Sequence, residues 1–327
     1  MCNTTQSEHC MDDIFAASIV GVTSFPGLVF YVAFNVTALR FREYREHAYY
    51  QLAVALGVFD CATLLTLILY CVPSILFQTE GHKWLNMTFG SVMLACWYGS
   101  MPIILALAFN RYYYVCNRNQ YKFSFNPENI RNIISGSFVF GGTYAIIPWF
   151  DCCGFVFYPD YYAWGWNMKQ LGGFILNYID LSLTCTTVLT STLLNARVFY
   201  KYRQMHQGIS QSEEGPQSDF ERVRRQREFK LFIQFFIIIC WMTVFDFVFV
   251  IAPFVTPSKW FYLLITWMWC IHSSINGWAY IGLNPNLRKR VFLAANLIQT
   301  TALGAVASGT HVTSNGVKMT RVQSQAN

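Results

Sequence analysis

Charge is scarce in this sequence. Of its 327 residues only 12% are Asp, Glu, Lys or Arg, against about 25% in an ordinary soluble domain. Hydrophobic residues make up 54% and aromatic residues 18%, and the mean hydropathy is +0.32. These values exclude a disordered chain, a collagen, a coiled coil and a small disulfide scaffold. A chain this apolar is expected in a membrane.

Long runs with one charged residue or none show how such a chain would cross the bilayer. A spanning helix needs about 20 mainly apolar residues, and the runs are continuous rather than alternating, which excludes a β-barrel. Seven windows qualify: 14–39, 48–79, 84–110, 132–150, 170–196, 231–258 and 260–287. The sequence predicts an all-α membrane protein. It divides into an outer tail (1–13), one domain of seven transmembrane helices ending in a short amphipathic surface helix (14–298), and a disordered inner tail (299–327).

Basic residues are missing from one set of loops, and this fixes the predicted orientation. Lys83, Lys169 and Lys259 fall on one side, and the other twenty of the 23 Lys and Arg residues fall on the other. The positive-inside rule then places the N-terminus outside. The net charge of +6 reflects topology, and no nucleic-acid partner is expected. The sequons at Asn3 and Asn86 fall outside, where glycans are expected.

The outer side also carries features that leave alternatives open. A disulfide is expected among Cys2, Cys10, Cys71, Cys152 and Cys153, with the pairing undetermined. The loop over 151–169 is rich in Phe, Tyr and Trp. It is either an aromatic belt at the membrane interface or a lid over a pocket.

Signatures of catalysis are absent from the sequence. It contains no paired His/Glu metal spacing, no Gly-rich phosphate loop and no nucleophile elbow, so neither an enzyme nor a resident cofactor is expected. A ligand-gated channel or transporter is the alternative class. Transporters usually show internal repeats, and none is visible here.

Ionisable residues within spanning helices are costly and therefore informative. Asp60 lies in the second window, Asn110-Arg111-Tyr112 closes the third, and Asn276 precedes Tyr280 by four residues in the seventh. With the seven helices, these residues resemble a rhodopsin-like G-protein-coupled receptor. Residues 228–234 and 272–288 further resemble the nematode serpentine chemoreceptors, class X most of all.

The resemblance implies roles for these residues. Arg111 would be the cytoplasmic switch that engages a heterotrimeric G protein, although Asn110 replaces the usual acid beside it. Asn276 and Tyr280 would form the helix-seven switch, and Tyr112 completes the helix-three motif. Asp60 would bind a sodium ion with Ser100, His272 and Ser273, or would simply be hydrogen-bonded to its neighbours. Further implied are arrestin binding by the C-terminal tail and a place in the plasma membrane of sensory cilia, with a role in olfaction.

The residues at fixed positions before Arg111 also give information about the ligand. Met93 stands where amine receptors carry an acid, and Asn86 stands where most receptors carry a disulfide cysteine, so the outer loop must be held differently. A small organic odorant or pheromone in a mostly apolar cavity is expected, lined by Met93, Trp97, Trp241, Val244 and Phe245. Asp180 and Asp246 are unexplained by the motifs. We expect one of them, with Asp180 favoured, to contact a polar or cationic group of the ligand, the alternative being that Asp246 bonds a neighbouring helix at His272.

Overall fold

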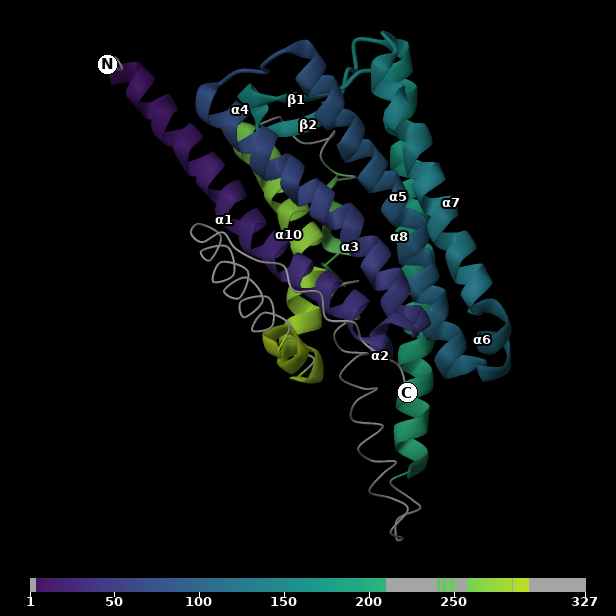
Figure 1. Ribbon diagram of the computed structural model, residues 1–327. Coiled ribbons are helices and arrows are strands. Elements are labelled where there is room, and N and C mark those ends of the chain that lie inside the picture. The colour runs from purple at the N-terminus through teal and green to yellow at the C-terminus, as the bar shows by residue number, and fades with distance from the viewer. Residues whose placement is uncertain are drawn as a thin grey trace, which may run out of the picture.

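The computed structural model describes residues 4–209, 240–241, 243–245, 247–249, 251, 258–283 and 285–293. Long helices lie side by side in a bundle (Figure 1). They are α1 (Thr4–Arg40), α3 (Ala48–Thr66), α5 (Lys83–Cys116), α7 (Pro127–Ile146), α8 (Leu171–Ile209) and α10 (Lys259–Leu283). The predicted helix over 231–258 falls largely outside the described residues.

Shorter elements join these helices. A π-helical turn η1 (Leu67–Cys71) and α4 (Val72–Phe77) continue α3, and α2 (Arg42–Arg45) and α6 (Arg118–Ser124) lie at the opposite end of the bundle from the N-terminus. The 3-10 turns η2 (Ile147–Trp149) and η3 (Pro159–Tyr161) flank the strands β1 (Phe155–Tyr158) and β2 (Ala163–Trp166). Residues 285–293 are helical, in agreement with the start of the predicted surface helix.

Several described helices are suited to a bilayer. Four segments are long and apolar enough to cross one: Cys10–Arg40, Ala48–Phe77, Lys83–Cys116 and Leu171–Gln204. Large apolar side chains point out of the bundle, among them Val22 (73% exposed), Leu69 (62%) and Leu189 (62%). A soluble surface rarely exposes so much contiguous apolar area, so this surface fits a lipid environment.

Local sequence explains where the helices begin and end. Asn126 caps α7, its side chain accepting a hydrogen bond from the Asn129 backbone N–H at 2.8 Å, and Pro127 follows at the first helical position, where it needs no N–H partner. Gln78 ends α4 in the left-handed conformation (φ 47°). Helix α1 begins at Thr4, before Ile14, where the first transmembrane window was predicted to start. Most of the predicted tail over 1–13 is therefore helical.

Glycines let the helices approach closely, as is common between membrane helices. A Cβ atom built on Gly141 of α7 would lie 3.0 Å from the Gly99 Cα of α5 and would collide with the Ala95 carbonyl oxygen. A Cβ built on Gly27 of α1 would lie 2.6 Å from the Ser274 Cβ of α10. These contacts bring the backbone of α5 close to that of α7, and the backbone of α1 close to that of α10.

A β-hairpin covers the end of the bundle that holds the N-terminus of α1 (Figure 1). Its strands pair antiparallel, with Phe155 opposite Trp166 and Tyr158 opposite Ala163. The expectation of a purely helical chain missed this element. Phe155, Phe157 and Trp166 are at most 5% exposed, so they pack down onto the helices. We call residues 155–166 the cap.

Within the described residues, two cysteines that are adjacent in the sequence form a disulfide. Cys152 is bonded to Cys153 just before the cap, which resolves the open pairing. Gly172 at the start of α8 packs against this pair, because a Cβ there would lie 2.5 Å from the Cys153 Sγ. The bond therefore shapes the loop that leads from η2 into the cap, against the start of α8, without cross-linking two helices.

Candidate functional site

Asn86 fastens the cap to the first turn of α5. Its Oδ1 accepts a hydrogen bond from the Phe157 backbone N–H at 2.9 Å, and its Nδ2 donates to the Phe157 carbonyl oxygen at 3.2 Å. The amide thus pairs with the backbone N–H and carbonyl at the edge of β1, as a neighbouring strand would. Asn86 is 2% exposed, and the nitrogen that would carry the predicted glycan is buried and hydrogen-bonded, which argues against a sugar at this residue. Asn3 lies outside the described residues.

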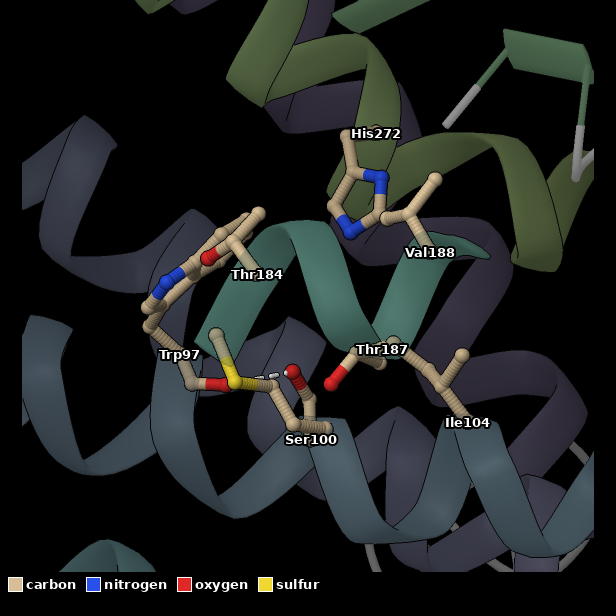
Figure 2. A pocket seen from close by; sticks show the side chains of 8 residues that line it. Trp97, Ser100, Ile104, Thr184, Thr187, Val188 and His272 are labelled. Carbon is tan, nitrogen blue, oxygen red and sulfur yellow. Dashed lines mark hydrogen bonds between the residues drawn. The ribbon is translucent and has the colours of Figure 1, made fainter. Parts of the chain in front are cut away.

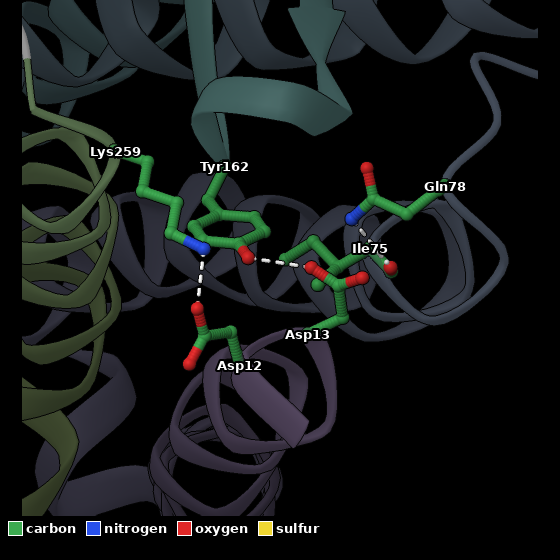
Figure 3. Close-up of polar contacts among 6 residues, drawn as sticks. All are labelled: Asp12, Asp13, Ile75, Gln78, Tyr162 and Lys259. Carbon is green, nitrogen blue, oxygen red and sulfur yellow. Dashed lines mark hydrogen bonds and ion pairs between the residues drawn. The ribbon is translucent and has the colours of Figure 1, made fainter. Parts of the chain in front are cut away.

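Tyr162 gives the cap a second set of anchors (Figure 3). Its hydroxyl donates to Asp13 Oδ1 of α1 at 2.5 Å, and its carbonyl accepts from Thr266 Oγ1 of α10 at 2.7 Å. Burial, followed by the bond to Asp13, raises the pKa of Tyr162 above its ordinary value, so the phenol is protonated and can donate at neutral pH. Beside it, Lys259 of α10 forms an ion pair with Asp12.

Beneath the cap, Asp180 joins three elements. This residue of α8 is 5% exposed and accepts a hydrogen bond from the Trp97 indole of α5 at 3.0 Å. The polar atoms of Tyr98, Trp166 and Thr184 face the same carboxyl group. Because Trp166 belongs to β2, Asp180 connects the cap with α5 and α8. A buried carboxylate requires donors, and the Trp97 indole supplies one. The polar atoms of Tyr98, Trp166 and Thr184 lie nearby but have no hydrogen-bond partner in the described part of the chain.

A small cavity lies directly below this junction (Figure 2). About 240 Å³ of space, part of it open to solvent, lies between the side chains of α5, α8 and α10. Its described lining residues are Trp97, Ser100, Met101, Ile104, Thr184, Thr187, Val188 and His272. No Asp, Glu, Lys or Arg is among them. The cavity is therefore mostly apolar, with hydroxyl groups and one imidazole.

His272 is the most informative residue of this cavity. It is 5% exposed, stacks on Phe245 with ring centroids 5.6 Å apart and lies edge-on to Trp97 at 5.9 Å. Its Nδ1 has no hydrogen-bond partner within the described part of the chain, and Figure 2 shows the ring among the side chains that line the cavity, beside Val188 of α8. A buried polar group without a partner is costly, which marks the position where a guest molecule could bind.

The residues predicted to bind the ligand lie in different places relative to the cavity. Trp97 lines the cavity, and Phe245 (2% exposed) and Trp241 pack in the aromatic cluster beside it. Met93 is fully buried under the cap and does not line this cavity. Val244 is 52% exposed, so the expectation that it faces inward is wrong: adjacent helical positions differ by about 100°, and Phe245 takes the inward one. Asp246 lies outside the described residues.

Asp60 is held by hydrogen bonds in the middle of the bundle. The Tyr31 hydroxyl of α1 donates to its Oδ2 at 2.5 Å, and Asn276 of α10 is a further hydrogen-bonding neighbour. Ser100 instead donates to the Trp97 carbonyl oxygen at 2.7 Å and, with His272, lines the cavity, to which Asp60 does not contribute. Ser273 is buried. The hydrogen bonds of Asp60 fit the hydrogen-bonded alternative, and the sodium site stays a prediction.

At the far end of the bundle, Arg111 contacts Tyr49 of α3. Arg111 Nη2 donates to the Tyr49 hydroxyl at 3.0 Å, and its guanidinium carbon lies 4.9 Å from the centroid of the same ring. Tyr280 of α10 lies edge-on to that ring, with centroids 6.3 Å apart. Asn110 is buried and neighbours the Tyr121 hydroxyl of α6, whose pKa is raised by burial. Tyr112 packs toward Val198 and Tyr202 of α8.

Three tyrosines with important contacts, Tyr31, Tyr49 and Tyr162, were missed by sequence reasoning. The chain contains 19 tyrosines, and none of the three stands in a motif. The α8 residues of the cavity were missed as well, because Thr184, Thr187 and Val188 are ordinary in a membrane helix. The replacement of a loop cysteine by Asn86 was the available signal for a different fastening of the cap.

A helical bundle with a lipid-compatible surface, a cap over the end that holds the N-terminus of α1 and an Arg–Tyr cluster at the other end fits a polytopic membrane protein. The family model of the serpentine type 7TM GPCR chemoreceptor Srx matches residues 22–284, and the chain belongs to this family. This confirms the resemblance to nematode serpentine chemoreceptors. No curated protein sequence matches the chain.

Proposed function

We propose that this receptor binds a small uncharged organic molecule in the cavity beneath Trp97 and, in response, activates a heterotrimeric G protein at the end of the bundle that holds Arg111. Membership of the chemoreceptor family supports the receptor class. The observation that carries the ligand proposal is the Nδ1 atom of His272, which has no hydrogen-bond partner in the described part of the chain and lies at a mostly apolar cavity.

The cavity defines the chemistry of the ligand. A charged ligand would require an opposite charge to offset its desolvation, and the described lining offers none. Met101, Ile104 and Val188 supply apolar contacts, and His272 can form one hydrogen bond. The space of about 240 Å³ includes volume that is open to solvent, so the enclosed room is small and the lining side chains would have to move to admit a guest. A compact alcohol, ketone or ester fits these requirements.

Asp180 acts on this cavity through its neighbours. The indole that it holds forms one wall, and Thr184 lies on another. Its carboxyl group already faces several protein donors, so we propose that Asp180 sets the shape of the cavity and contacts a polar ligand group only at the upper rim. Met93 and Trp241 would bound the same region from α5 and from the sixth helix.

Arg111 supplies the proposed coupling end. In the structure its guanidinium points at α3, and engagement of a G protein would require it to leave Tyr49. Asn276 and Tyr280, which neighbour Asp60 and Tyr49, respectively, would link the core to this movement. The inner tail over 299–327 lies outside the described residues, and its predicted contact with arrestin stays a prediction.

The function can be tested by expressing the receptor in cells with a broad set of Gα subunits. Small alcohols, ketones and esters are compared with amines and carboxylates of matched size, with cAMP and calcium as readouts. We expect dose-dependent responses to uncharged compounds only. Arg111→Ala should abolish the response at unchanged surface level, since its removal leaves no buried charge unpaired. A ligand-gated current in cells lacking G proteins would instead support the channel alternative, which family membership does not favour.

A further inference from the structure

The geometry points to Tyr49 as the residue that holds the cytoplasmic switch at rest. This inference rests on the proposed coupling function and adds its regulation: the contacts of Tyr49 help to keep the Arg111 guanidinium inside the bundle. Tyr49 is a positioning residue, because it acts through Arg111 and Tyr280.

Two distinct contacts bind Arg111 to Tyr49. The phenol oxygen accepts a hydrogen bond from Nη2 at 3.0 Å, and the guanidinium carbon lies 4.9 Å from the ring centroid, within the range of a cation–π interaction. Tyr49 is only 9% exposed. Partial burial strengthens both contacts, because less water competes for the cation.

Tyr49 also contacts the second switch residue. Tyr280 lies edge-on to its ring at 6.3 Å and stacks on Phe34 of α1 at 4.4 Å. Tyr280 is 2% exposed, so this arrangement is packed on all sides. One residue of α3 therefore touches both Arg111 of α5 and Tyr280 of α10. Movement of either side chain away from the other must break a contact with Tyr49.

Asn110 explains why a new partner is needed. An amide carries no charge, so it cannot form the ion pair that an acid would form with the adjacent guanidinium. Asn110 is instead turned toward Tyr121 of α6. The residue beside Arg111 therefore supplies no ion pair, and the hydroxyl and ring of Tyr49 contribute a restraint of their own.

The principal test is a comparison of conservative variants. Tyr49→Phe keeps the ring and removes the hydroxyl, whereas Tyr49→Leu also removes the π face. Tyr70→Phe is the matched control. Tyr70 is also buried (6% exposed), and its hydroxyl donates to the Glu80 carbonyl oxygen at the outer end of the same helical run. All variants are compared at equal surface level.

Agonist-independent loading of GTPγS onto purified heterotrimers is measured in membranes that contain each variant. Loss of a hydrogen bond to a charged group shifts a two-state equilibrium by about tenfold or more. We expect basal loading to rise about tenfold with Tyr49→Phe, further with Tyr49→Leu, and not with Tyr70→Phe. A merely structural role would lower loading through loss of folded receptor. Unchanged or reduced loading with Tyr49→Phe would overturn the inference.

A double-mutant cycle tests the contact without a G protein. Thermal unfolding is measured for purified wild-type receptor, Tyr49→Phe, Arg111→Ala and the double variant. Residues in contact give non-additive changes, so Tyr49→Phe should have little further effect once Arg111 is absent. Additive shifts would overturn the inference.

Failure of the inference and failure of the proposed function give different results. If Arg111→Ala signals like the wild type, the proposed coupling role of Arg111 is wrong. If Arg111→Ala is silent and Tyr49→Phe behaves like the wild type, the coupling role stands and the role of Tyr49 is refuted.

Discussion

The fastening of the cap by Asn86 leads to a prediction whose magnitude can be worked from the structure. Asn86→Ala removes two hydrogen bonds of 2.9 and 3.2 Å and leaves the buried N–H and carbonyl of Phe157 without partners. Each unsatisfied backbone group costs about 1–3 kcal/mol. We expect the free energy of unfolding to fall by about 2–4 kcal/mol, because the cap can relax partly toward water.

Thr88 provides a control at the same sequon. Its side chain is exposed, and its hydroxyl donates to the Trp84 carbonyl oxygen within the helix. Thr88→Ala destroys the Asn86-Met87-Thr88 sequon and leaves the Asn86 amide in place. If Asn86 carried a glycan, both variants would lose it. If Asn86 is the fastening, only Asn86→Ala affects stability.

The assay combines thermal unfolding of purified receptor with gel mobility before and after glycosidase treatment. Asn86→Ala should lower Tm by several degrees, at about 2–4 °C per kcal/mol, with no change in mobility. Thr88→Ala should change neither. A glycosidase-sensitive mobility difference between wild type and Thr88→Ala would show that Asn86 is glycosylated and would refute the reasoning. A Tm for Asn86→Ala equal to that of the wild type would also refute it.

Three further predictions concern packing, ligand response and topology. Gly141→Ala should destabilise the receptor by about 1–3 kcal/mol through overpacking against α5. The neighbouring Gly142→Ala should be neutral or slightly stabilising, because a Cβ there meets nothing within 4 Å. Equal melting curves for the two variants would contradict this. Asp180→Asn should raise the half-maximal concentration of an active odorant at least tenfold, about 1.4 kcal/mol, because an amide presents N–H groups to the donors around it; an unaltered dose–response curve would reject the role of Asp180. An N-terminal tag should stain intact cells and a tag after Asn327 should require permeabilisation, with the reverse pattern contradicting the predicted orientation.

The helices were largely predictable from the sequence because lipid imposes a simple rule on them. Runs without charge had to be helical, and the predicted windows overlap α1, α3, α5, α7, α8 and α10. The cap was not predictable in the same way. Four-residue strands give little periodic signal, and their aromatic residues equally suit a membrane interface.

Side-chain partners were harder to predict than side-chain depth. Asp60 and Asp180 are buried as expected of intramembrane acids, yet their partners come from helices far away in the sequence. Asp60 is bonded by Tyr31, which is 29 residues distant, and Asp180 by Trp97, which is 83 residues distant. Such pairs depend on helix rotation and tilt, which hydropathy does not encode. Val244 and Phe245 show the same limit: if the helix were rotated by one residue position, Val244 would face the core and Phe245 would face the lipid.

The bond between Cys152 and Cys153 has a consequence for how the outer end of the receptor opens. In the loop-entropy account, a disulfide stabilises more when it closes a longer loop, and adjacent cysteines close the shortest one. Within the described residues no covalent link ties the cap to a helix, so Asn86, Tyr162 and the Trp164–Cys71 contact hold it reversibly. Reducing agents would therefore leave the attachment of the cap intact.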